Sequence, residues 1–231
     1  MTHYLTKSAL AAAIALGALA VPAAAQVNGI ATVRPAVVVA QSQALQSGYQ
    51  LISTNFTPQF TQLEQLNTQR VELLRSIDTN GNGQVEELDT NGDGNLDEAE
   101  QARNPAVAQA ATLDQQIGAL EAPIQMAQLY VVYQVAQQYG ASAQAVIAER
   151  GVQVMLAPEA IVFAADGLDI SPLVAANLNT RLPSVSITPA AGWQPDETTI
   201  GLYQQVQQIF ATMAARAQQQ PAGAAAATEG R

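Results

Sequence analysis

The chain lacks cysteine altogether and has one lysine and one histidine among its 231 residues. Without cysteine, neither a disulfide framework nor a thiolate metal site can form. Nine basic residues against 19 acidic ones give a net charge of −10, and so few cations cannot neutralise a row of phosphates, so we expect no nucleic-acid partner. The sole histidine is His3, and no nucleophile with a neighbouring base is recognisable, so we do not expect an enzyme.

The N-terminus has the pattern of a cleavable export signal. Lys7 precedes an apolar run over residues 9–21, and three alanines at 23–25 precede Gln26. The run is short for a bilayer span, which makes a membrane anchor the weaker reading. Residues 1–25 are therefore predicted to be a signal peptide that directs the protein to the periplasm. Removing Lys7 leaves eight arginines against 19 acidic residues, a net charge of −11, and no later segment reads as transmembrane.

Two long segments, 41–77 and 98–150, carry apolar residues at helical spacing. The first stripe consists of Leu45, Tyr49, Ile52, Phe56, Phe60, Leu63, Leu66, Leu74 and Ile77. The second consists of Val107, Ala110, Leu113, Ile117, Leu120, Ile124, Ala127, Val131 and Val135. Neither helix can bury its stripe alone, so the two are predicted to pack antiparallel as a helical hairpin.

Four positions interrupt these stripes. Thr57-Pro58 marks either a helix start or a kink in one continuous helix. Arg70 stands where the first stripe calls for an apolar residue, and Val71 is expected to take its place. Pro123 and Gly140 are expected weak points of the second helix.

Short β-branched segments flank the two helices. Residues 29–34 are predicted to form a strand that ends at Pro35, and residues 151–164 a strand pair, 152–156 and 161–163, with a turn at Pro158. A short helix is predicted from Asp169 through Leu178. Residues 180–218 form a C-terminal extension with an amphipathic helix over 198–218, and residues 219–231 are predicted to be disordered.

The acidic stretch 78–100 contains two overlapping copies of a calcium-loop pattern. It holds 8 of the 19 acidic residues and no basic one. In the second copy, Gly94 supplies the sharp turn of an EF-hand loop, and oxygen ligands stand at the template positions. These predicted Ca²⁺ ligands are Asp89, Asn91, Asp93, Asn95, Asp97 and Glu100.

The first copy is predicted to bind Ca²⁺ more weakly, because an aspartate replaces the longer glutamate at its twelfth position. Its ligands would be Asp78, Asn80, Asn82, Gln84, Glu86 and Asp89. The alternative is a solvated acidic loop without metal. Val85 and Leu96, at the apolar eighth position of each copy, favour calcium. We expect calcium to stabilise this turn rather than to signal.

The order of elements resembles the Skp or OmpH family of periplasmic chaperones for outer-membrane proteins. The resemblance covers residues 29–179 and is carried by three motifs. These are Gly29-Ile30-Ala31-Thr32-Val33, the pair 151–156 and 160–164, and Asp169-Ile170-Ser171 with Asn177-Leu178-Asn179. It implies an α+β, mostly helical fold, in which a long coiled-coil hairpin stands on a small β-sheet or barrel base in residues 26–179.

The resemblance also implies a homotrimer that holds unfolded outer-membrane proteins between its arms without ATP. Three features depart from the family: the acidic charge, the insert 78–100 at the arm tip, and the extension beyond Asn179. The sequence therefore predicts a periplasmic holdase with a calcium-binding tip. The alternatives are a calcium-dependent structural or adhesion protein of the cell envelope without chaperone activity, and a calcium buffer without a client.

Overall fold

The computed structural model describes residues 29–77, 105–161, 163 and 167–219. This part of the chain is mostly helical (77%), with six helices and one two-stranded parallel sheet. The predicted signal peptide, the calcium stretch 78–100 and the tail from residue 220 lie outside the described residues.

A small sheet forms one end of the described structure. Strand β1 (Ile30–Thr32) pairs in parallel with β2 (Val154–Leu156), Ala31 opposite Met155. On its other side, the Thr32 amide donates to the carbonyl of Leu168, and the Ile170 amide donates to that of Thr32. The strand β1 therefore lies between β2 and the 168–170 segment, although these segments are far apart in sequence.

The predicted strand at 161–163 is wrong at the two of its residues that are described. Pro158 starts a short 3-10 helix (η2, Pro158–Ala160), after which neither Ile161 nor Phe163 belongs to a strand. Phe163 is 86% exposed. The second neighbour of β1 is instead the segment around Asp169. The side chains of Leu168 and Ile170 in this segment are buried and supply the apolar packing beside β1.

Two short helices lead from β1 toward the long helices. Helix α1 (Pro35–Gln41) starts at Pro35, shortly after β1 ends at Thr32, and it buries Val38 and Val39. Ser42 joins it to α2 (Gln43–Asn55): its hydroxyl donates to the Val39 carbonyl and accepts from the Leu45 amide. One fully buried serine thus caps both helices, and the predicted helix over 41–77 begins only after it.

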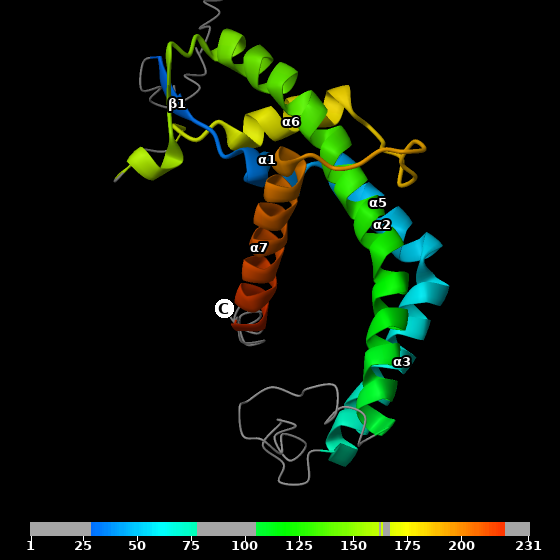
Figure 1. Ribbon diagram of the computed structural model, residues 1–231. Coiled ribbons are helices and arrows are strands. Elements are labelled where there is room, and N and C mark those ends of the chain that lie inside the picture. The colour runs from blue at the N-terminus through cyan, green and yellow to red at the C-terminus, as the bar shows by residue number, and fades with distance from the viewer. Residues whose placement is uncertain (1–28, 78–104, 162, 164–166, 220–231) are drawn as a thin grey trace, which may run out of the picture.

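The two striped segments lie side by side and run in opposite directions (Figure 1). Helices α2 and α3 (Thr57–Ile77) pack along α5 (Pro105–Arg150). A break at Phe56 separates α2 from α3, and the Thr57 hydroxyl donates back to the Ser53 carbonyl. The hydroxyl therefore does not cap a new helix, which favours a kink. We call α3 and residues 105–128 of α5 the arm.

Most of the described stripe residues are buried or half-buried, whereas Phe60 is 39% exposed. Arg70 is half-buried and its Nε pairs with Asp114 of α5, whereas Val71 points outward and is 48% exposed. Val71 therefore does not take the place of Arg70 in the inward-facing stripe. At this level the Arg70–Asp114 ion pair joins the two helices. Helix α5 continues unbroken through Pro123 and Gly140.

The C-terminal extension packs on the same core. Helix α6 (Ser171–Arg181) and helix α7 (Glu197–Gln219) agree closely with the predicted helices. The loop between them contributes Val185 and Ile187 to the core, and α7 contacts both α1 and α5.

Candidate functional site

The eleven predicted calcium positions, with Asp89 shared by both loops, all lie in residues 78–100, outside the described residues. Within the described ranges, no group of three or more histidine, cysteine, aspartate or glutamate side chains is gathered to hold a metal ion. Candidate functional surfaces within the described residues are therefore the sheet end, the arm and helix α7 with the helices that it packs against.

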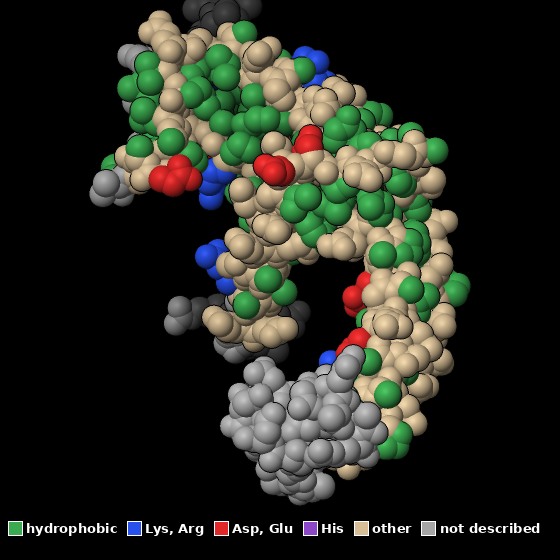
Figure 2. All heavy atoms as spheres, viewed as in Figure 1, with side chains coloured by type: hydrophobic (Ala, Val, Ile, Leu, Met, Phe, Trp, Pro, Cys, Tyr) green, Lys and Arg blue, Asp and Glu red, His purple; other side chains and the backbone are tan. Residues whose placement is uncertain are grey.

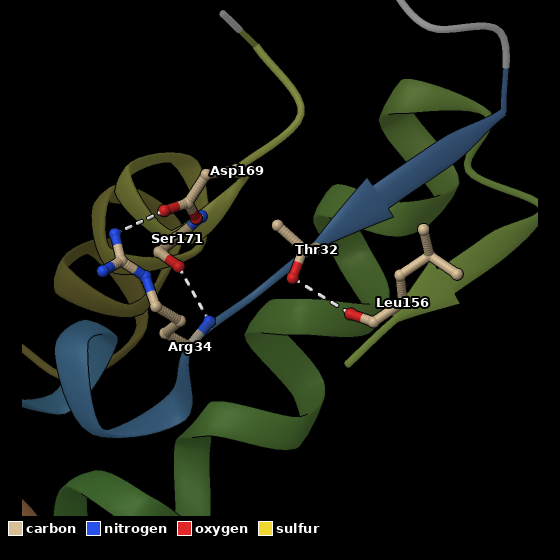
Figure 3. A network of polar contacts seen from close by, with 5 residues as sticks. All are labelled: Thr32, Arg34, Leu156, Asp169 and Ser171. Atoms are coloured by element: carbon tan, nitrogen blue, oxygen red, sulfur yellow. Dashed lines mark hydrogen bonds and ion pairs between the residues drawn. The ribbon is translucent and has the colours of Figure 1, made fainter. Parts of the chain in front are cut away.

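A polar network fixes the sheet end (Figure 3). Thr32 Oγ1 donates to the Leu156 carbonyl at 3.0 Å, and the Arg34 amide donates to Ser171 Oγ at 2.9 Å. The Arg34 guanidinium pairs with Asp169 at 2.6 Å. These contacts tie β1 to both of its neighbours. We call β1, β2, α1 and α6 the base.

The carboxylate of Asp169 is held in its charged form. Partial burial acts to raise its pKa, but hydrogen bonds with Ser171 and the Arg34 guanidinium outweigh burial and hold the pKa below its ordinary value. Among these contacts, the Ser171 amide donates to Asp169 Oδ1 at 2.9 Å. The first turn of α6 is thereby joined to the end of β1.

Strand β2 exposes apolar side chains on both of its faces. Val154, Met155 and Leu156 of β2 are all exposed, as is Ile30 of β1. A strand that leaves both its edge and its apolar side chains in solvent is a site where another chain can add. The base is therefore the part of the described structure best suited to self-association.

Helix α7 packs along α1 and α5, and specific polar and aromatic contacts join it to α2 and α5. The Tyr203 hydroxyl donates to Gln128 Oε1 at 2.7 Å, and Gln207 Nε2 donates to the Tyr49 hydroxyl at 3.4 Å. The Tyr49 and Phe210 rings meet edge to face, with centroids 6.0 Å apart. Burial raises the pKa of both Tyr49 and Tyr203, so both hydroxyls stay neutral.

Grooves flank α7 and the arm. One, of about 320 Å³, lies where Tyr203 of α7 meets the arm, and it is lined by Phe60, Leu63 and Ile124 with the carboxylate of Glu121. Another, of about 530 Å³, lies between α7 and the base beside Arg34, Glu159 and Met213. Figure 2 shows an open space between the free end of α7 and the arm.

An aromatic cluster anchors the loop between α6 and α7. Trp193 packs against Tyr130 and Tyr133 of α5, with ring centroids 4.9 and 5.5 Å away. The amide of Gln134 bonds the backbone of Ser186 twice, donating to its carbonyl at 2.7 Å and accepting from its N–H at 3.0 Å. Tyr130 and Tyr133 of α5 thus hold the extension.

Comparison with known proteins adds no assignment: no protein-family model, no curated protein and no solved structure matches the chain. Within the described ranges, no helix is long and apolar enough to cross a bilayer.

Sequence reasoning did not find the contacts of α7. The stripe position of Tyr49 indicated burial, but nothing in the sequence paired it with Phe210, 161 positions later. The one available signal was the amphipathic spacing of α7, which requires a partner surface without identifying it.

Proposed function

We propose that the protein is a periplasmic, non-catalytic holdase chaperone that binds unfolded outer-membrane proteins and carries a calcium-shaped arm tip. The observation that carries the proposal is the antiparallel pair of α2–α3 with α5, which stands on a small sheet with an uncovered apolar edge. This arrangement is consistent with the one that the Skp resemblance implies. A holdase needs no catalytic group, only a shielded surface with many weak contacts.

The trimer belongs to the same proposal. Strand β2 would pair or pack with neighbouring copies through Val154, Met155 and Leu156, closing the base into a barrel. A two-stranded sheet buries little on its own, and self-association would supply the missing burial. Light scattering of the mature chain should therefore give the mass of three copies.

Two variants of equal exposure test the interface. Val154 in β2 and Val71 on α3 are each 48% exposed. V154K should shift the mass toward the monomer, because it places a charge in the apolar contact, whereas V71K should leave the trimer intact. A wild-type monomer at every concentration would exclude the proposed architecture.

The chaperone activity has a direct test. An outer-membrane β-barrel protein, unfolded in urea and diluted into buffer, aggregates and scatters light. The mature protein should suppress this scattering at a ratio of about one trimer per client. Undiminished aggregation would refute the holdase proposal. Calcium-dependent binding of a folded envelope protein would then favour the structural or adhesion role.

A further inference from the structure

Helix α7 is docked along only half its length. From Thr199 to Phe210 it contacts the rest of the structure, and Val206 is fully buried. From Ala211 to Gln219 every residue is exposed, and Met213 is 59% exposed. The helix therefore leaves the arm at its C-terminal end, as the space-filling view shows (Figure 2).

The docked half has the chemistry of an apolar polypeptide segment. No charged residue occurs between Glu197 and Arg216. Its apolar contacts recur at helical spacing, at Tyr203, Val206 and Phe210, and glutamines fill much of the rest. The surface beneath it on α1, α2 and α5 thus accommodates an uncharged segment with regularly spaced apolar side chains.

This surface continues beyond α7. The groove beside Tyr203 extends it along the arm to Phe60, Leu63 and Ile124, and Phe60 remains exposed. An occupant longer than the docked half of α7 therefore has the exposed ring of Phe60 to cover, beside the polar groove residues Glu121, Gln125 and Gln128. The docked half buries Thr199 and Val206, and its other apolar side chains pack only half-buried against the core, at Leu202, Tyr203, Ile209 and Phe210.

We propose that the surface beneath α7, together with the adjoining groove, binds an uncharged apolar segment of an unfolded polypeptide, and that α7 occupies this surface as an intramolecular competitor. The inference rests on the proposed holdase function and names the site of that function. Client binding requires α7 to leave, so the apparent affinity is reduced by the fraction of molecules in which α7 is docked.

The absence of cysteine allows a direct experiment. In V206C the new thiol lies under α7, and in S142C it lies in α5 at a position that is also fully buried. Adding the unfolded outer-membrane protein should raise the rate of thiol labelling of V206C at least threefold and leave S142C protected. Hydrogen exchange of the wild-type chain supplies the same readout without a substitution: amides of residues 201–210 should exchange faster when client is bound.

A second pair of variants measures the competition. F210A removes the ring contact with Tyr49, whereas M213A alters an exposed residue on the same helix. F210A should bind client several-fold more tightly than the wild type, and M213A should not change the affinity.

The outcomes separate the two proposals. If aggregation is suppressed while the labelling of V206C and the exchange of 201–210 stay unchanged or fall, the competitor role is wrong and the holdase function stands. If neither the wild type nor any variant suppresses aggregation, both proposals are overturned.

Discussion

Gly48 and Val131 lie in direct contact where α2 crosses α5. A Cβ atom on Gly48 would stand 2.7 Å from Val131 Cγ1, closer than van der Waals contact allows. The same Cβ would stand 2.8 Å from Val185 Cγ2. Helix α2, helix α5 and the loop of the C-terminal extension therefore meet at a point that only glycine can occupy. This contact makes the extension part of the main core.

The first prediction concerns this crossing. G48A should lower the free energy of unfolding by about 1–3 kcal/mol, because the added methyl group must displace two branched side chains. Urea denaturation followed by circular dichroism measures the loss. G118A is the matched control: a Cβ at Gly118 in helix α5 meets nothing within 4 Å. It should stabilise the protein by about 0.5–1 kcal/mol through helix propensity. Equal effects of the two variants would contradict the steric argument.

The second prediction concerns the acid stability of the base. The lowered pKa of Asp169 means that its charged form stabilises the fold. This contribution is complete above the ordinary aspartate pKa of about 3.9, and it is lost as the pH falls through the lower pKa of the folded state. D169N should therefore lower the melting temperature near neutral pH, and the difference from the wild type should shrink below about pH 4. A difference that stays constant down to pH 2 would show that the carboxylate charge is not responsible.

The third prediction uses Trp193, the single tryptophan of the chain. Q134A removes both hydrogen bonds to Ser186 and should loosen the loop that presses Trp193 against Tyr130 and Tyr133. The fluorescence emission should shift to longer wavelength, and stability should fall by about 1–2 kcal/mol. Q137A, at an exposed position of the same helix, should change neither quantity. An unshifted emission spectrum in Q134A would show that the aromatic contacts hold the loop without the amide.

Local patterns in the sequence predicted most helices but not how they associate. The stripes of α3 and α5 follow from hydrophobic spacing, because residues such as Leu63 and Ile117 must be buried whatever their partner. The prediction of a strand at 161–163 was wrong because β propensity indicates only that a segment can form a strand, not which strand it pairs with. The pairing with β1 was decided by long-range packing, which buries Leu168 and Ile170 and leaves Phe163 outside.

The calcium loops can be proposed from sequence alone, because calcium ligands follow a fixed local spacing, and the ligand assignment from Asp89 to Glu100 stays a prediction. The contacts of α7 with Tyr49 and Gln128 join residues 75 or more positions apart and have no local signature. Barrel closure and trimerisation depend on other copies of the chain, so they remain part of the proposed function.

The fourth prediction concerns the calcium stretch. D89A combined with E100A removes the residue shared by both predicted loops and the twelfth ligand of the stronger one. Titration calorimetry of the mature wild type should detect calcium binding, and the double variant should show no heat of binding, because Asp89 serves both loops. The mass by light scattering should stay the same, since the predicted self-association uses the base.

The control for that variant must remove the same amount of charge elsewhere. E64A combined with E149A deletes two exposed carboxylates, one on α3 and one on α5, outside the calcium pattern. If calcium were merely attracted to an acidic surface, both double variants would weaken binding alike, and the effect would fade with added salt. Coordination predicts the opposite: binding is lost only with D89A and E100A, and it resists salt in the control. Full affinity in the D89A and E100A variant would disprove the ligand assignment and leave the acidic stretch as a solvated loop.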